Sequence, residues 1–177
     1  MRTQVAIIGG GPSGLMLAQL LHTRGIESVV LERKTKDYVL SRIRAGVLER
    51  GMLQLMDEAG CSDRMRAENY SHDGTYISYG EESFRIDFAA LTGHPVMVYG
   101  QTEVTRDLYD AREKTGGPIE FNVDDVVINS ADGDTPYITY TVDGQPRRID
   151  CDFVAGCDGF HGGSRQTIPL SVRREYE

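Results

Sequence analysis

Cysteine is scarce in this 177-residue sequence, and the three that occur are Cys61, Cys151 and Cys157. An odd number of cysteines with no C-x-x-C pair argues against a disulfide framework and against a zinc site. The histidines do not suggest a metal site either, because His22, His94 and His161 are scattered along the chain. We therefore expect no bound metal and a reducing, cytoplasmic location.

Long apolar runs are also missing. No stretch approaches 18 apolar residues, so we expect no membrane span, and residues 1–8 lack the apolar core and cleavage site of a signal peptide. Positive charge is in deficit, because 19 lysines and arginines against 27 acidic residues give a net charge of −8. That balance argues against a nucleic-acid partner. The remaining composition, with 40% hydrophobic residues, is typical of a globular domain with a real core.

The N-terminal segment carries the strongest pattern in the chain. Residues 3–8 form an apolar, β-branched run, which predicts a buried strand. This run leads into a G-x-G-x-x-G at residues 9–14, and then into leucines at helical spacing as far as Gly25. Residues 27–31 predict a second strand, which ends at Glu32. Strand, glycine loop, helix and strand in this order are typical of a dinucleotide-binding unit.

Each position in that unit has a physical role. Gly9 permits the tight turn, Gly11 lets the backbone approach a pyrophosphate, and Gly14 lets helix and strand pack closely. The helix N-terminus supplies free N–H groups and partial positive charge to the phosphates. Glu32 lies where an acid can bind the hydroxyls of an adenosine ribose. The unit alone does not separate FAD from NAD.

A cluster of cations follows the second predicted strand, and its members are Arg33, Lys34, Lys36, Arg42 and Arg44. On charge alone this segment is interpreted as a solvated loop. The alternative is a binding site for a second anionic ligand beside the first, because a 2′-phosphate and a pyrophosphate need several cations.

The rest of the chain predicts an α/β fold. We expect a helix from residue 47 up to Ala59-Gly60, a hairpin at 75–87, a strand at 96–99 and a helix at 101–114. We also expect a short strand at 119–123, a meander over 126–150, an apolar strand at 151–156 and a helix beginning at Ser164. Residues 4–8 should be central in a parallel sheet, with residues 29–31 and 96–99 beside them. The meander should cover one side, and residues 153–155 should return to the sheet. The hairpin should belong to a larger sheet, since an isolated hairpin is marginal in water.

Four separated motifs now stand out. They are the glycine loop at 9–14, Arg42-Ile43-Arg44-Ala45-Gly46-Val47, Tyr99-Gly100-Gln101, and Gly156-Cys157-Asp158-Gly159-Phe160-His161. With them, residues 1–169 resemble the class A flavoprotein aromatic hydroxylases, for which the Asp-Gly motif is specific. Residues 37–51 and 99–104 resemble the branch that acts on hydroxybenzoate. The resemblance implies a Rossmann-like FAD-binding fold of the glutathione-reductase type, with a β-meander and a fragment of a substrate-domain sheet.

The resemblance also implies a division of the chain. Residues 1–71 and 95–177 would form a discontinuous FAD-binding domain, and the hairpin at 72–94 would belong to a substrate domain that is otherwise absent. Family members are roughly twice this length, and their substrate-binding residues lie beyond residue 177. We therefore expect an N-terminal part of the enzyme that is inactive by itself and binds FAD or ADP weakly or not at all.

The family's site residues map onto this chain by resemblance. FAD would be held by Gly9, Gly11, Ser13, Gly14, Glu32, Arg33, Arg42, Ile43, Arg44, Ala45, Gly46, Val47, Gln101, Asp158 and Gly159. NADPH would be held by Arg33, Lys34, Tyr38, Arg42, Arg44, His161 and Arg165. A cation at Lys34 should favour NADPH over NADH. His72 matches the outer end of the family's proton relay, and the alternative is a surface histidine.

The implied activity is that of an FAD-dependent, NADPH-using monooxygenase in the breakdown of aromatic compounds. It would hydroxylate 4-hydroxybenzoate to 3,4-dihydroxybenzoate, and the resemblance allows a homodimer. Two alternatives stay open. One is a non-catalytic module that binds an adenine dinucleotide. The other is a NAD(P)-dependent dehydrogenase, against which the Asp158-Gly159 motif counts.

Overall fold

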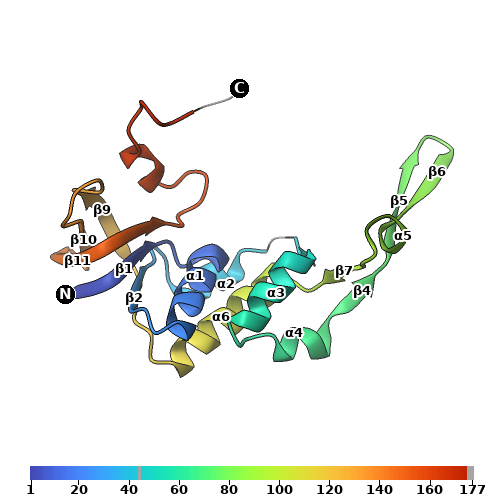
Figure 1. Cartoon of the computed structure of the whole chain (residues 1–177), viewed down its shortest axis with the longest axis horizontal. Coiled ribbons are helices and arrows are strands. Elements are labelled where there is room, and N and C mark those ends of the chain that lie inside the picture. Colours follow the sequence, from blue (N-terminus) through green and yellow to red (C-terminus); the bar gives the residue numbers. More distant parts are fainter. Residues whose placement is uncertain (44, 175–177) are drawn as a thin grey trace.

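The computed structural model describes residues 1–43 and 45–174, and Figure 1 shows an elongated arrangement with the largest sheet at one end. The helices are α1 (Pro12–Thr23), α2 (Lys36–Ser41), α3 (Arg50–Glu58), α4 (Asp63–Glu68), α5 (Phe88–Thr92) and α6 (Gln101–Lys114), with a 3-10 turn η1 (Ser164–Thr167). The strands are β1 (Arg2–Ile8), β2 (Ser28–Leu31), β3 (Val47–Leu48), β4 (Tyr70–His72), β5 (Gly74–Tyr79), β6 (Glu82–Asp87), β7 (Val96–Val98), β8 (Ile119–Glu120), β9 (Val123–Asn129), β10 (Tyr137–Val142) and β11 (Gln145–Gly156).

The largest sheet has the strand order β8-β2-β1-β11-β10-β9. β1 pairs in parallel with β2 on one side and with β11 on the other, and β2 pairs in parallel with β8. The helix α1 connects β1 to β2, as a parallel pair requires. The α/β class and the central place of β1 are therefore confirmed.

The long strand β11 joins two kinds of pairing. Its first half, residues 145–150, pairs antiparallel with β10, and residues 150–156 pair in parallel with β1. The meander is thus continuous with the parallel sheet through one strand. The predicted return of residues 153–155 to the sheet is confirmed.

Alternate residues of β1 face two different layers. Val5 and Ile7 pack with Ala18 of α1. Ala6 and Ile8 face the other way and pack with Ile138 and other buried residues of the meander. This is the period-two alternation of a strand that is covered on both faces. The prediction that the meander covers one side of the sheet is confirmed.

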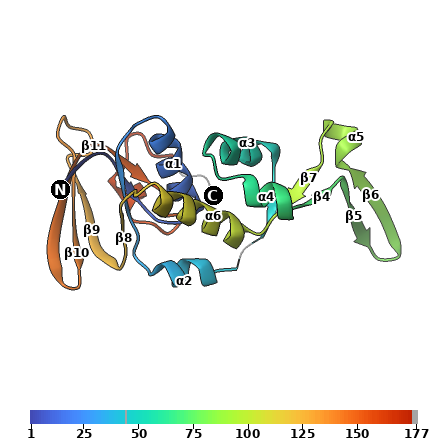
Figure 2. The same cartoon turned by 90° about the horizontal axis from the view of Figure 1, so that it is seen from below.

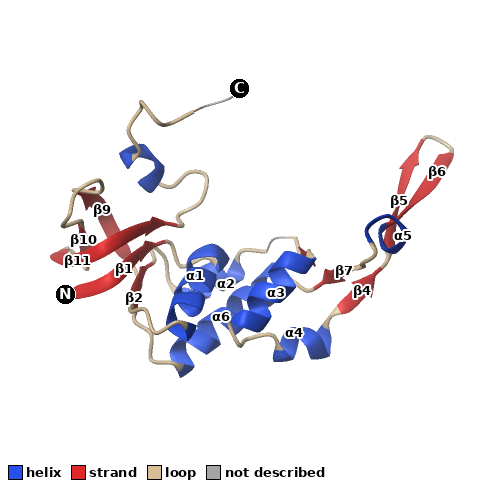
Figure 3. Cartoon of the chain, viewed as in Figure 1, coloured by secondary structure: helices blue, strands red, loops and turns tan. Residues whose placement is uncertain are grey.

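A second core lies among the helices, which Figure 3 shows grouped between the two sheet regions. Leu15 of α1, Met56 of α3 and Met65 of α4 are buried together with Leu108 of α6. α6 packs directly on α1, and Leu15 in the first turns of α1 is part of this core. The helix α6 has the bounds predicted from the sequence, residues 101–114.

The prediction that residues 96–99 lie beside the central strand is wrong. β7 belongs instead to a small sheet of order β3-β7-β4, in which both of its neighbours run antiparallel to it. The place beside β2 is taken by β8. β3, β4, α4 and α5 were not predicted, and the helix expected from residue 164 is only a 3-10 turn.

The basic segment contains a helix as well as loop. α2 begins after Thr35, whose side-chain oxygen accepts a hydrogen bond from the backbone N–H of Tyr38 at 3.1 Å. An N-cap of this kind satisfies a backbone N–H that the first helical turn leaves without a partner. The interpretation of the whole segment as a loop is therefore wrong for residues 36–41.

The hairpin β5–β6 is formed as predicted, with Gly80 at its turn in the left-handed conformation. It projects from the small sheet in both views (Figures 1 and 2). Tyr76, Tyr79 and Phe84 expose more than half of their surface. An open hairpin that carries aromatic side chains fits the expectation that it needs a larger sheet.

Within the described residues, none of the helices has the length and apolar character needed to cross a membrane. Within the same residues, no three or more His, Cys, Asp or Glu side chains are gathered where they could bind a metal ion.

Candidate nucleotide-binding site

The glycine loop begins at the carboxyl end of β1. Gly9 has φ +108°, a conformation that favours glycine, and a Cβ built on it would lie 2.4 Å from the carbonyl oxygen of Cys157. The N–H of Cys157 in turn donates to the carbonyl of Ile8 at 2.7 Å. The sequence motif at 9–14 and the Asp-Gly motif at 158–159 are therefore brought side by side.

Gly14 and Gly11 meet very different surroundings. A Cβ on Gly14 would lie 1.9 Å from the carbonyl oxygen of Gly9, so only glycine lets α1 approach the end of β1 this closely. A Cβ on Gly11 would meet no described atom within 4 Å. The loop is thus closed toward the core and open at the N-terminus of α1, where backbone N–H groups can meet an anion.

Glu32 lies at the end of β2, next to this loop. One carboxylate oxygen accepts a hydrogen bond from the N–H of Gly10 at 2.7 Å, and the other accepts from the N–H of Lys34 at 2.8 Å. A carboxylate oxygen can accept more than one hydrogen bond, so both oxygens keep capacity for ribose hydroxyls. The predicted ribose-binding acid and the glycine loop are in contact.

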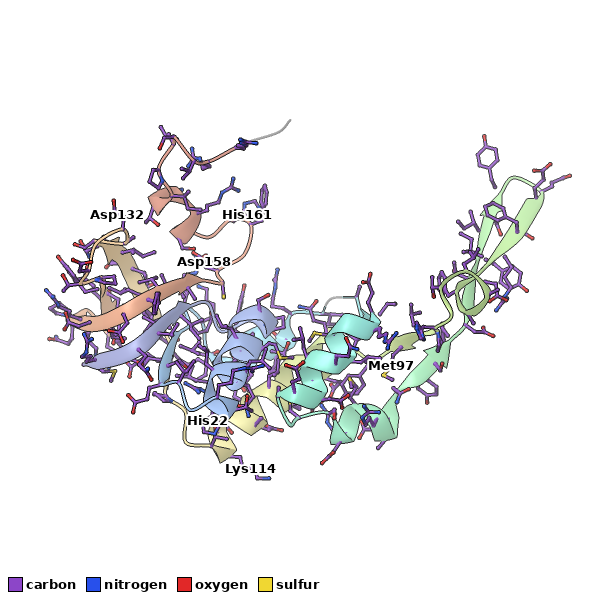
Figure 4. All side chains as sticks on the ribbon, viewed as in Figure 1. His22, Met97, Lys114, Asp132, Asp158 and His161 are labelled. Carbon is purple, nitrogen blue, oxygen red and sulfur yellow. The ribbon has the colours of Figure 1, made fainter. Side chains whose placement is uncertain are left out.

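A cavity of about 640 Å³ opens at this end of the sheet. It is lined by Gly9, Glu32, Arg33, Asp158 and His161, all of them predicted site residues, and by residues of β9 and of the segment 162–167. A crevice outside the carboxyl ends of parallel strands is where α/β sheets bind nucleotides. In Figure 4 Asp158 and His161 lie on the segment that faces this end of the sheet.

Sequence reasoning missed the contribution of β9 to the cavity. Asp124, Asp125 and Val127 line it. Asp125 has φ +50°, and its carboxylate accepts a hydrogen bond from the hydroxyl of Thr141 at 3.1 Å. No motif marks these residues, because the meander reaches the cavity only through the long-range folding of the sheet.

The Asp158 side chain holds together the turn formed by residues 158–164. Its carboxylate accepts from the N–H of Ser164 at 2.9 Å and from the Ser164 hydroxyl. A Cβ on Gly162 would lie 2.1 Å from the Asp158 carboxyl carbon, so the segment folds tightly over this side chain. Burial raises the pKa of the neighbouring Cys157 thiol, and the charge of Asp158 raises it further. Asp158 thus fixes the wall of the cavity.

The second predicted flavin segment meets the third motif. Gly46 accepts a hydrogen bond from the N–H of Tyr99 at 2.8 Å, and a Cβ on Gly46 would lie 2.6 Å from the Cα of Gly100. Gln101 is the first residue of α6, directly after this contact. Four predicted residues of the segment, Arg42, Ile43, Ala45 and Val47, are exposed. Arg44 lies outside the described residues.

Tyr99, which follows β7, is held in place by a buried carboxylate. Asp107 of α6 accepts from the Tyr99 hydroxyl at 2.7 Å and from Nε of Arg64 at 2.7 Å. Burial raises the pKa of Tyr99, and its hydrogen bond to Asp107 raises it further. The end of β7 is thereby fixed to α6 and α4.

The predicted nicotinamide-binding cations lie in two groups. The Tyr38 ring has Lys34 Nζ and Arg42 Cζ each 5.7 Å from its centroid. Arg33 and His161 line the cavity, and Arg165 lies over the Phe160 ring at 5.2 Å. Lys36 was part of the cation cluster, but its Nζ is 2.7 Å from the carboxylate of Glu113 on α6. It therefore anchors α2.

His72 is not part of this site. It is exposed on β4 and pairs across the small sheet with Val96. Met97, the register partner of the adjacent Ser71, lies well away from Asp158 and His161 in Figure 4. A role for His72 in proton transfer to solvent stays a prediction.

Comparison with known proteins gives consistent matches. A family model described as an FAD binding domain matches residues 2–177. The p-hydroxybenzoate hydroxylase of Acinetobacter baylyi is 44% identical over 178 residues, which cover 100% of this chain and 44% of that protein. A 12-dehydrotetracycline 5-monooxygenase/anhydrotetracycline 6-monooxygenase of Streptomyces rimosus is 31% identical, over 93% of this chain and 32% of that protein.

A solved structure has the same fold. The crystal structure of p-nitrophenol 4-monooxygenase from Pseudomonas putida matches with a TM-score of 0.81 over 93% of this chain and 43% of that one, at 23% identity. The chain therefore spans less than half the length of each of these three proteins.

Proposed function

The chain belongs to the FAD-binding-domain family of the class A flavoprotein hydroxylases, and from that premise we propose that it holds FAD for the hydroxylation of 4-hydroxybenzoate to 3,4-dihydroxybenzoate. The observation that carries the proposal is the contact of the glycine loop with Glu32 beside an open cavity. The identity of 44% to a p-hydroxybenzoate hydroxylase supports the choice of substrate.

The residues of the loop fit FAD. The open space at Gly11 leaves room for a pyrophosphate at the N-terminus of α1, and Glu32 has acceptor capacity for the ribose. The segment 42–47 and Gln101 would hold the flavin end, and Asp158 and Gly159 would serve FAD and the nicotinamide cofactor together. When bound, the flavin supplies electron transfer from the nicotinamide to O2 and oxygen insertion beside the phenol oxygen.

We further propose NADPH as the reductant. The seven residues assigned to it by resemblance are Arg33, Lys34, Tyr38, Arg42, Arg44, His161 and Arg165. Two cations next to the Tyr38 ring, Lys34 and Arg42, support the assignment, because the anionic groups of NADPH need several positive charges. Lys34 would favour the 2′-phosphate of NADPH over the free hydroxyl of NADH.

The proposed division of the chain follows from the same premise. Residues 1–71 and 95–177 form the FAD-binding part, and residues 72–94 belong to the sheet of a substrate domain. The exposed aromatic side chains of the hairpin support this, since they have little packing of their own. His72 at the base of the hairpin would pass the phenol proton to solvent.

The alternative is a module that binds an adenine dinucleotide without catalysis. Titration of the purified chain with FAD, followed by its visible spectrum and by calorimetry, tests the proposal. A perturbed flavin spectrum with saturable binding supports it. Saturable binding of ADP with no effect on the flavin spectrum favours the non-catalytic module. Because we expect this chain to bind weakly, the titration extends to high ligand concentrations, and no binding of either ligand at those concentrations contradicts both.

A further inference from the structure

Tyr109 lies on the core side of the glycine loop. It is fully buried on α6, and its hydroxyl donates to the carbonyl oxygen of Gly10 at 2.8 Å, across 99 positions of sequence. Burial raises the pKa of this hydroxyl, and the negative charge of Glu32 raises it further. The group is therefore protonated and able to donate at neutral pH.

The carbonyl of Gly10 and the N–H of Gly11 belong to one planar peptide group. In a trans peptide these two bonds point in opposite directions, and the described residues contain no cis peptide. Because the Gly10 carbonyl points at Tyr109 in the core, the Gly11 N–H points away from the core. The space beside Gly11 is also open, because a Cβ built on this residue would meet no described atom within 4 Å.

The preceding peptide is held in a similar way. Its N–H, on Gly10, donates to the carboxylate of Glu32 at 2.7 Å. Two successive peptide groups of the loop are thus each fixed by one side chain, one from the core and one from the end of β2. Glu32 is the predicted ribose ligand, and Tyr109 carries no role in the sequence motif.

We propose that Tyr109 is a positioning residue for the pyrophosphate of the bound dinucleotide, because its hydroxyl holds the Gly10–Gly11 peptide with the Gly11 N–H facing the phosphate oxygens. The inference rests on the proposed function, since it presumes that a dinucleotide occupies the loop. The two side chains then serve different parts of the ligand: Tyr109 positions the loop for the phosphates, and Glu32 accepts hydrogen bonds from the ribose.

Removal of the hydroxyl alone is feasible. The Tyr109 ring packs against Phe121 at a centroid distance of 6.0 Å, and Lys36 Nζ lies 5.4 Å from its centroid. Neither contact uses the hydroxyl, so Tyr109→Phe keeps the ring in place. Tyr140→Phe is the matched control, because Tyr140 is also a buried tyrosine but its hydroxyl interacts with Arg147 and not with the glycine loop.

The experiment compares ADP with adenosine as ligands of the full 177-residue chain, by calorimetry or by NMR titration. Tyr109→Phe should weaken ADP binding by about three- to tenfold, because binding must then order the Gly10–Gly11 peptide that the lost hydrogen bond held in place, and should change adenosine binding by less than about twofold. Tyr140→Phe should change neither affinity. Glu32→Ala should weaken both ligands.

Three results would overturn the inference. An unchanged ADP affinity with a lowered melting temperature would mean that the hydroxyl is only structural. Equal losses for ADP and adenosine would mean that Tyr109 supports the site as a whole. Failure of the unaltered chain to bind either ligand would contradict the proposed nucleotide site itself, and this inference with it.

A second measurement covers the case in which Tyr109→Phe does not fold. In the unaltered chain, the buried Tyr109 hydroxyl proton should exchange more slowly with water when ADP is bound than when adenosine is bound. The reason is that bound phosphate stabilises the loop conformation in which the Gly10 carbonyl accepts the hydrogen bond from Tyr109. Equal exchange rates with the two ligands would contradict the proposal.

Discussion

The Glu32 carboxylate and the Gly10 backbone N–H form a hydrogen bond of 2.7 Å, so the acid at the end of β2 also holds the glycine loop. Glu32→Ala removes this bond together with the acceptor for the ribose hydroxyls. Each charge-assisted hydrogen bond contributes roughly 1.5–3 kcal/mol, so the affinity for FAD or ADP should fall by about tenfold or more. Calorimetry measures the change. Glu27→Ala, at an exposed position before β2, is the control and should leave the affinity unchanged.

Gly11→Val should abolish dinucleotide binding and leave the fold intact. A side chain at this position fills the space for the pyrophosphate, but its Cβ would meet no described atom within 4 Å in the protein itself. Circular dichroism should therefore match that of the unaltered chain, while ADP binding is lost. Retained ADP affinity would show that the loop is not the site.

Gly14→Ala should have the opposite effect on folding. The added methyl group would lie 1.9 Å from the Gly9 carbonyl oxygen, a backbone atom that cannot move without separating α1 from β1. Overpacking of this kind typically costs about 1–3 kcal/mol or more. We expect a clear fall in the urea midpoint, and a midpoint equal to that of Gly11→Val would argue against the observed close approach.

The elements that short sequence patterns determine were predicted correctly, above all the N-terminal dinucleotide-binding unit. Strand, glycine loop, helix and second strand follow one another between residues 2 and 31, and each is marked by periodicity or by glycine. The hairpin was predictable for the same reason, from two alternating runs around Gly80. The bounds of α6 follow from its apolar spacing and from the Thr115-Gly116 stop.

Features that depend on contacts between distant parts of the sequence could not be predicted in this way. The strand β7 is as apolar as a central strand, and nothing within it says that its partners are β3 and β4 rather than β2. The contributions of Asp125 and Tyr109 to the site were not predictable either. One depends on the meander folding against the sheet, and the other depends on a contact across 99 residues.

The thiol of Cys61 should react slowly with iodoacetamide at pH 8. Burial raises its pKa to about 11, with a smaller contribution from the charge of Asp107. Because the thiolate is the nucleophile, alkylation should be at least about tenfold slower than in the urea-unfolded chain, and should speed up as the pH rises toward 11. Peptide-resolved mass spectrometry measures the rate.

The same shift has a consequence for stability. A folded-state pKa raised above the unfolded value means that the folded state keeps its proton longer, so the contribution is present below the unfolded pKa and is lost as the pH rises. Urea midpoints should therefore fall between about pH 9 and 11. Cys61→Ser should reduce that fall, and an unchanged pH profile in this variant would assign the effect to other groups.

The chain by itself should not hydroxylate 4-hydroxybenzoate. The reaction needs the phenolate within about 3–3.5 Å of the reacting flavin atom, and it needs water to be kept out. The segment that would hold the flavin is open, because Ile43 is 93% exposed and Val47 is 60% exposed. Arg33 and Lys34 lie next to Glu32 at the nucleotide end and would bind phosphates rather than the substrate carboxylate.

We therefore expect NADPH oxidation in the presence of FAD, O2 and 4-hydroxybenzoate, if it occurs at all, to release hydrogen peroxide in place of the hydroxylated product. Chromatography for 3,4-dihydroxybenzoate, with a peroxide assay and a control that contains free FAD without protein, measures the partition. Product formed in proportion to the NADPH consumed would show that these 177 residues suffice to anchor the substrate and to exclude water, contrary to the exposure of Ile43 and Val47.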